Sequence, residues 1–357
     1  MRCASRVGQS LLLPSLLMQL LLLTFALASF VPARAQNQEP PKKGKSSKVE
    51  KAAAAADLPA VLWRDPGDIS SLDLIHGIGG AQDAPGENEQ YKFVKEDLNG
   101  TSTKFYVEDK EGVQWLLKIG EEAQPETAAT RLVWSMGYFT DEDYYLPTIH
   151  VSGIPHLHRG NGDIAADGTI TGARLKRQSR TQKNIGNWSW FDNPFLHTRE
   201  FDGLRVMMAL INNWDLKTDN NKIYSEKDTE RRYVVSDEGA SFGRTGGPTT
   251  RSKGNLQQYR EAKFIDHVGA DEVDFVMATR PLPLLAPFEL PNYVRRNSME
   301  GVTKHIPRAN AKWIGQQLAR LTSRQIGDAF RAAGYSQDDV QAYTQAVMAR
   351  IAQLNAL

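Results

Sequence analysis

Two polar stretches in the middle of the chain bring together residue types that can bind a metal and move a proton. Asp215, Lys217 and Asn220 lie within six positions, and Asp237 follows Asn220 by 17. A carboxylate and an amide oxygen that converge can hold Mg²⁺, which prefers hard oxygen ligands, so Asn220 and Asp237 are predicted metal ligands. A further carboxylate can orient a hydroxyl group and accept its proton, and a lysine can neutralise charge on a group in transfer. These requirements predict catalytic roles for Asp215 and Lys217.

The sequence around these residues predicts how they are positioned. A helix should precede Asp215, because apolar residues recur at helical spacing before it. These are Phe201, Leu204, Met207, Met208 and Ile211. Residues 222–224 and 233–235 have the pattern of two short strands, and their pairing would bring Asn220 and Asp237 to one end of a hairpin. The alternative is that residues 215–220 form only a polar turn after a helix.

A lysine nearer the N-terminus is the second feature that suggests a site. Lys118 ends an apolar run that predicts a buried strand, and a lysine there is costly unless it is paired. Glu126 lies in a predicted helix from Pro125 to Gly137, with proline in its first turn and glycine at its end. We therefore predict an ion pair between Lys118 and Glu126. A surface lysine at a strand end is the alternative.

Three antiparallel strands are predicted between residues 91 and 119, joined by turns at 99–102 and 109–112. In the first turn, Gly100 and Ser102 offer a small residue, a hydroxyl group and free backbone N–H groups. A loop that closes over phosphates needs these features. An ordinary hairpin turn is the alternative.

The motif Asp215-Leu216-Lys217-x-x-Asn220, followed by Asp237-Glu238-Gly239, resembles the catalytic and metal-binding loops of the protein-kinase-like superfamily. The Lys118–Glu126 pair resembles the strand lysine and helix glutamate that fix the α- and β-phosphates of ATP in that superfamily. The short gap between this strand and helix is closer to HipA-type proteins. Secretory-pathway kinases provide the precedent for an exported member.

The resemblance implies an α+β, two-lobed kinase-like fold. A small antiparallel β-rich lobe would span residues 58–178, and a mainly helical lobe would span residues 179–357. It also implies transfer of the ATP γ-phosphate, with Mg²⁺, to an unknown hydroxyl group on a protein or small molecule. Lys118, Glu126, Gly100 and Ser102 would then bind the nucleotide.

Three positions depart from the protein-kinase pattern. Asn213 stands where the pattern has histidine, Trp214 where it has arginine, and Glu238 where it has the phenylalanine that packs beneath the metal loop. Two alternatives to an active kinase therefore stay open. One is a pseudokinase that binds a nucleotide or a partner without turnover, and the other is an exported binding protein that kept the fold.

The first 35 residues have the pattern of a signal peptide. Arg2 and Arg6 precede an apolar run, and Ala33-Arg34-Ala35 is a small-x-small cleavage site, which predicts export with cleavage after Ala35. An uncleaved membrane anchor is the alternative, because about 20 apolar residues can span a bilayer. The only cysteine, Cys3, lies in this segment, so the mature chain would have no disulfide bond.

The remaining segments carry little chemistry of their own. Residues 36–57 are rich in proline, lysine and alanine and have the pattern of a flexible basic linker. The predicted signal segment contains three arginines and no acid, so the formal net charge of +1 becomes −2 without it. This charge argues against nucleic acid as a partner. The basic run 176–183 is interpreted as a solvated loop, and three helices are predicted at 309–321, 324–333 and 340–354.

Overall fold

The computed structural model describes residues 55–86, 89–179, 181–244, 251–277 and 299–357, together with residues 290, 294 and 297. The predicted signal segment and nearly all of the predicted linker lie outside these ranges. In the described part of the chain, no helix is long and apolar enough to cross a membrane.

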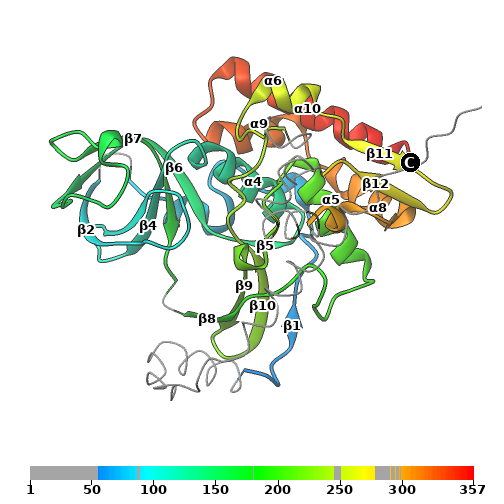
Figure 1. Cartoon of the computed structure of the whole chain (residues 1–357), viewed down its shortest axis with the longest axis horizontal. Coiled ribbons are helices and arrows are strands. Elements are labelled where there is room, and N and C mark those ends of the chain that lie inside the picture. The colour runs from blue at the N-terminus through cyan, green and yellow to red at the C-terminus, as the bar shows by residue number, and fades with distance from the viewer. Residues whose placement is uncertain are drawn as a thin grey trace, which may run out of the picture. The chain divides into compact units, whose positions relative to one another are not determined.

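Five strands close into a barrel in the order β2-β3-β4-β7-β6 (Figure 1). Their bounds are β2 Gln90–Glu96, β3 Lys104–Glu108, β4 Gln114–Ile119, β6 Asp143–Ser152 and β7 Thr169–Arg177. The predicted antiparallel strands between residues 91 and 119 are confirmed as β2, β3 and β4. Parallel pairing of β2 with β6 closes the barrel.

The barrel has its own apolar core, and the alternation of side chains along β4 decides which residues enter it. Trp115, Leu117 and Ile119 are buried members of this core. Successive side chains of a strand point to opposite faces, so Lys118 lies on the other face of β4. It is nevertheless only 2% exposed.

Helix α4, Ala123–Ser135, contributes to this burial and follows β4 after a short turn. Gly120 lies in the turn with a φ of +101°, a conformation that side-chain-bearing residues rarely adopt. The helix begins two residues before Pro125, the predicted start, and Gly137 lies beyond its end as predicted. The predicted strand-to-helix connection is therefore confirmed.

A second sheet has the order β1-β10-β9-β8, and β5 also pairs with β10. The bounds are β1 Ala60–Val61, β5 Phe139–Thr140, β8 Gln182–Gly186, β9 Asn221–Glu226 and β10 Glu230–Val235. The predicted hairpin is confirmed as β9 and β10, and the predicted helix before it is α5, Arg199–Leu210. The interpretation of 176–183 as a loop was wrong at its C-terminal end, because residues 182 and 183 belong to β8.

The C-terminal part of the chain is mainly helical, as predicted. Its helices are α6 Leu256–Glu261, α8 Arg308–Leu318, α9 Ser323–Ala332 and α10 Gln337–Asn355. A three-stranded sheet there comprises β11 Ile265–Val268, β12 Glu272–Phe275 and β13 Ile306–Pro307. Helices α5, α8, α9 and α10 contribute to one large apolar core.

The remaining described elements are short. They are η1 Ile69–Ser71, η2 Gly77–Gly79, α3 Gly80–Asp83, η3 Asn161–Asp163, η4 Thr218–Asn220 and η6 Gly301–Thr303. The fold is therefore mixed, with β-sheets and helices. The two-lobed arrangement and its boundaries at 58–178 and 179–357 stay predictions.

Candidate active site

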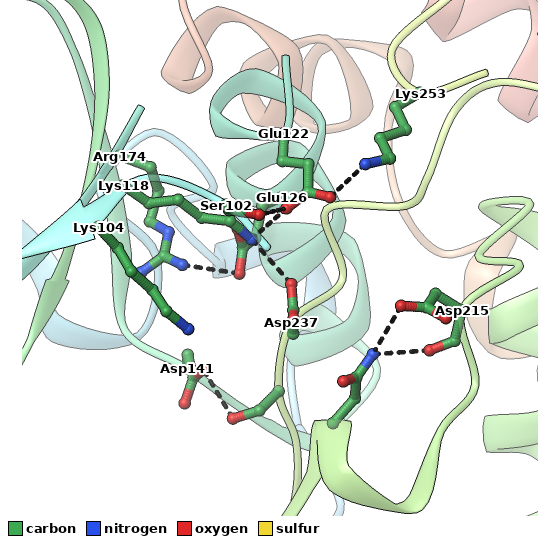
Figure 2. Close-up of polar contacts among 12 residues, drawn as sticks. Ser102, Lys104, Lys118, Glu122, Glu126, Asp141, Arg174, Asp215, Asp237 and Lys253 are labelled. Atoms are coloured by element: carbon green, nitrogen blue, oxygen red, sulfur yellow. Dashed lines mark hydrogen bonds and ion pairs between the residues drawn. The ribbon is translucent and has the colours of Figure 1, made fainter. Parts of the chain in front are cut away.

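Lys118 of β4 lies at the centre of three carboxylates, two from the start of α4 and one from the segment after β10 (Figure 2). Its Nζ lies 2.5 Å from Glu122 Oε2, 2.9 Å from Glu126 Oε2 and 2.8 Å from Asp237 Oδ1. We call Lys118, Glu122, Glu126 and Asp237 the lysine cluster. The predicted pairing of Lys118 with Glu126 is present, and Asp237 joins it from 119 positions further along the chain.

Local structure explains why these side chains converge. Glu122 and Glu126 are four residues apart at the start of α4, so their side chains lie on the same face of the helix. Asp237 follows the end of β10 and has a φ of +61°. A positive φ is uncommon for a residue other than glycine and costs about 1–3 kcal/mol, so surrounding contacts must hold it. One such contact is the hydrogen bond that Lys118 donates to Asp237.

The charges of the lysine cluster stabilise one another. Burial alone would lower the pKa of Lys118, but the carboxylates of Glu126, Asp237 and Glu122 hold it above its usual range. Burial opposes ionisation of Asp237, yet Lys118 outweighs this effect and holds the pKa of Asp237 below its usual range. The same balance lowers the pKa of Glu122 to about 2. The carboxylates of Glu122 and Asp237 are therefore ionised beside the Lys118 ammonium group at neutral pH.

Glu126 has a second cationic partner that fixes it in place. Its Oε1 accepts a hydrogen bond of 2.9 Å from Arg174 Nη2. Arg174 Nη1 also lies 3.4 Å from Asp143 Oδ1. Arg174 is directly opposite Lys118 in the pairing of β4 with β7. The buried Glu126 carboxylate is thus held between two cations on neighbouring strands.

Two further buried acids, Asp143 and Glu238, lie near this group. Burial raises the pKa of Asp143 to about 7, even though Arg174 opposes the shift. Burial also raises the pKa of Glu238 well above its usual range, and neither of its carboxyl oxygens has a hydrogen-bond partner among the described residues. Glu238 is fully buried. It occupies the position where the resemblance expects phenylalanine.

Asp215, Lys217 and Asn220 form a second group, which we call the loop cluster. Lys217 Nζ lies 2.6 Å from Asp215 Oδ2. Asn220 Nδ2 donates hydrogen bonds to the Asp215 carbonyl oxygen at 2.7 Å and to Asp215 Oδ2 at 3.4 Å. The three predicted residues are therefore in contact with one another.

The hairpin brings Asn220 and Asp237 to one end, but their side chains have different partners. Ser236 N donates a hydrogen bond of 3.0 Å to the Asn220 carbonyl oxygen, which confirms the predicted backbone arrangement. The amide group of Asn220 contacts Asp215, whereas the Asp237 carboxylate contacts Lys118. No hydrogen bond joins the side chains of Asn220 and Asp237 in the described part of the chain.

The two residues of the predicted phosphate loop are placed differently. Ser102 Oγ donates a hydrogen bond of 2.9 Å to Glu122 Oε2, so it lies beside the lysine cluster (Figure 2). Gly100 has a φ of +72°, and its carbonyl oxygen accepts a hydrogen bond from Arg159 Nη1. Ser102 is thus joined to the site, while Gly100 shapes the turn.

Several residues of the site were not predicted from the sequence. Glu122 lies four residues before Glu126, so both face the same side of the helix, and this spacing could have identified Glu122 from the sequence. Arg174 interrupts the apolar residues of β7, which is a weaker signal. Lys253 Nζ lies 2.5 Å from Glu122 Oε1, and nothing in the sequence indicated this contact across 131 positions.

The donor set is chemically suited to a divalent metal. Carboxylate oxygens of Glu122, Glu126 and Asp237 lie within 4.8 Å of one another. Mg²⁺ prefers such hard oxygen ligands and binds one or two protein carboxylates together with phosphate oxygens. Asp237 is the member best placed for this role, because its side chain is 45% exposed while that of Glu126 is fully buried.

The comparisons with known proteins give distant structural likenesses. No family model matches the chain, and no curated protein matches it. The chain is similar to the Helicobacter pylori proinflammatory kinase CtkA, at 9% identity and a TM-score of 0.43, over 75% of this chain and 97% of that one. It is also similar to the Golgi casein kinase, at 10% identity and a TM-score of 0.30, over 80% and 78% of the two chains. The Golgi casein kinase with Mn/ADP bound matches at 9% identity and a TM-score of 0.32, over 91% and 95%.

Proposed function

We propose that this protein is a kinase-like phosphotransferase that moves the γ-phosphate of ATP to a hydroxyl group. One observation carries the proposal: buried Lys118 pairs at once with Glu126 of α4 and with Asp237 after β10. A lysine held in this way presents a fixed positive charge beside a candidate metal ligand. Phosphoryl transfer needs this combination, because its catalysis consists mainly of positioning and of stabilising negative charge.

Each residue has a role in this proposal. Lys118, fixed by Glu126, binds nucleotide phosphates, and Ser102 and Gly100 form the loop beside them. Asp237 and Asn220 would hold Mg²⁺, which would supply positive charge to the phosphate oxygens.

The loop cluster would act on the acceptor. The Asp215 carboxylate would orient the incoming hydroxyl group and accept its proton. The preceding residue, Trp214, donates a backbone hydrogen bond of 3.3 Å to the Ala240 carbonyl oxygen, which connects this loop to the segment after Asp237. Lys217, bound to Asp215, neutralises charge on the transferred group. The acceptor is a hydroxyl group of a protein or small molecule.

We further propose that the protein works outside the cytosol, after cleavage of the signal segment following Ala35. The formal net charge of the mature chain, −2, makes nucleic acid an unsuitable acceptor. A membrane would be a partner only if the signal segment stayed uncleaved.

A pseudokinase that binds nucleotide without turnover is the second candidate. Glu238 favours it, because a fully buried carboxyl group replaces the phenylalanine of the resemblance directly after Asp237. The two candidates share nucleotide binding and differ in turnover.

The test of nucleotide binding is calorimetric titration of Mg-ADP into the chain and its Asp237→Asn variant. We expect the unmutated protein to bind and D237N to lose at least about tenfold in affinity, because one charged ligand is removed. Asp266→Asn is the matched control, since Asp266 is 44% exposed and pairs with Lys304 at 2.6 Å outside the site. Equal binding by all three proteins would overturn the assignment of Asp237.

A further inference from the structure

Glu122 is the point where three separate segments meet in the candidate site (Figure 2). Its carboxylate lies 2.5 Å from the ammonium group of Lys118, which is in β4. It also lies 2.5 Å from the ammonium group of Lys253, which is in the segment after Asp237. Ser102 Oγ from the β2–β3 turn donates a third contact at 2.9 Å. Two ammonium groups and a hydroxyl group therefore surround one anionic group.

This donor set is one that binds phosphate. Phosphate oxygens, like carboxylate oxygens, accept short charge-assisted hydrogen bonds from lysine and further bonds from hydroxyl groups. Glu122 is only 14% exposed on its side chain, so the position it fills is shielded from solvent. An anion bound in this place exchanges its contacts with water for contacts with Lys118, Lys253 and Ser102.

Lys118 cannot bind a phosphate while all three carboxylates keep their contacts. An ammonium group has three protons, and Lys118 already lies within 3 Å of three carboxylate oxygens. Glu126 is fully buried and held by Arg174 as well, so it is fixed. Asp237 is the candidate metal ligand, so it keeps its place in the proposed site. Glu122 precedes the first turn of α4 and has no such role, which makes it the carboxylate that can yield its place.

Lys253 is held at this position by backbone contacts on both sides. Gly254 N donates a hydrogen bond of 2.9 Å to the Ser241 carbonyl oxygen. The Ser252 carbonyl oxygen accepts a hydrogen bond of 3.1 Å from Trp214 Nε1. Its neighbours thus tie Lys253 to the loop after Asp237 and to the residue before Asp215.

We propose that Lys253 is a second phosphate-binding lysine of this site, and that Glu122 occupies the phosphate position until a polyphosphate group displaces it. Lys118, Lys253 and Ser102 then donate their hydrogen bonds to the phosphate instead of to Glu122. The identification of that group as part of a nucleotide rests on the proposed function, whereas the position and its donors do not.

The experiment is titration of Mg-ADP, and separately of inorganic tripolyphosphate without metal, into the full chain and its variants. Glu122→Gln removes the competing charge and should bind both probes about tenfold more tightly than the unmutated protein, because each donor forms a charge-assisted bond with the probe. Lys253→Ala should bind both about tenfold more weakly.

Two matched controls separate these effects from general changes in charge. Glu230→Gln changes an acid that is 12% exposed and paired with Arg232 at 2.6 Å. Lys304→Ala changes a lysine that is 26% exposed, close to the 24% of Lys253. Neither control should change the affinity for either probe.

The outcomes distinguish this inference from the proposed function. Weaker or unchanged Mg-ADP binding by E122Q, or unchanged binding by K253A, overturns the inference and leaves nucleotide binding in place. Tripolyphosphate binding that follows the expected pattern without any Mg-ADP binding supports the inference and overturns the proposed function. Binding of neither probe by any form overturns both. If E122Q does not fold, the comparison of probe affinity between K253A and its control K304A tests the inference alone.

Discussion

The lysine cluster and the loop cluster both join lysine to carboxylates, but they are assembled differently. In the lysine cluster, Lys118 contacts Asp237 across 119 positions of sequence, and the Lys118 side chain is 3% exposed. In the loop cluster, Asp215 contacts Lys217 and Asn220 within five positions. The Asp215 and Lys217 side chains are 17% and 25% exposed.

This difference determines which property of the protein a substitution in each cluster should change. A contact such as Lys118 to Asp237 forms only when β4, α4 and the hairpin are all in place, so it reports on the whole fold. Contacts within residues 215–220 can form in any tight turn. Substitutions in the lysine cluster should therefore change stability together with binding, whereas substitutions in the loop cluster should change the reaction alone.

The largest expected effect on stability comes from Lys118→Met. This variant leaves three carboxylates together without their shared cation, so we expect the free energy of unfolding to fall by about 3–5 kcal/mol. Mg-ADP binding should be lost as well. Urea denaturation and calorimetric titration measure the two effects.

Lys183→Met is the control for this comparison. Lys183 also forms one short ion pair, with Asp228 at 2.7 Å, but the two side chains are 50% and 66% exposed. Exposed pairs contribute about 0–1 kcal/mol, so little change is expected. A similar loss of stability in both variants would mean that the buried ion pairs of Lys118 stabilise the fold no more than the exposed pair of Lys183.

Asp215→Asn should reduce phosphate transfer, or slow ATP hydrolysis, by at least about 100-fold, which is about 2.7 kcal/mol in the barrier. Affinity for Mg-ADP should stay within a few-fold, because Asp215 acts on the acceptor. The free energy of unfolding should change by less than about 1 kcal/mol. Asp219→Asn, an exposed neighbour in the same loop, serves as the control. A protein that binds Mg-ADP but has no turnover dependent on Asp215 is a pseudokinase.

The sequence could predict the features that depend on nearby residues. A lysine in an apolar strand needs a partner, and the next helix offered Glu126 within eight positions. The C-terminal helices were predictable because their caps are local. Thr322 and Gln325 form a reciprocal capping box, and Ser336 caps α10.

The sequence could not predict the contacts that depend on how distant segments meet. Lys253 reaches Glu122 across 131 positions, and Arg174 reaches Glu126 across 48. The strand β8 was missed because its residues, Gln182–Gly186, are mostly polar, and only their pairing with β9 makes them a strand. Asn220 and Asp237 were correctly placed at one hairpin end, but both lie outside the paired strands β9 and β10, so the pairing does not determine the direction of their side chains.

The smallest expected effect follows from the charge balance at Glu122. Burial opposes its ionisation, but Lys118 outweighs this and lowers the pKa to about 2 from the usual 4.5. A carboxyl group with a lowered pKa in the folded protein stabilises the fold above its unfolded pKa. That contribution is lost as the pH falls through the folded pKa, because the unfolded chain takes up the proton first.

The free energy of unfolding of the unmutated protein should therefore fall more steeply than that of Glu122→Gln between pH 5 and pH 3. The expected difference over this interval is about 2 kcal/mol, since glutamine has no proton to gain. Between pH 5 and pH 7 the two proteins should change in parallel, because Glu122 stays ionised in both the folded and the unfolded chain. Urea denaturation at the three pH values measures both slopes. Equal slopes below pH 5 would mean that the Glu122 carboxylate is not held by Lys118 in solution, and the charge balance inferred for the lysine cluster would then be wrong at Glu122.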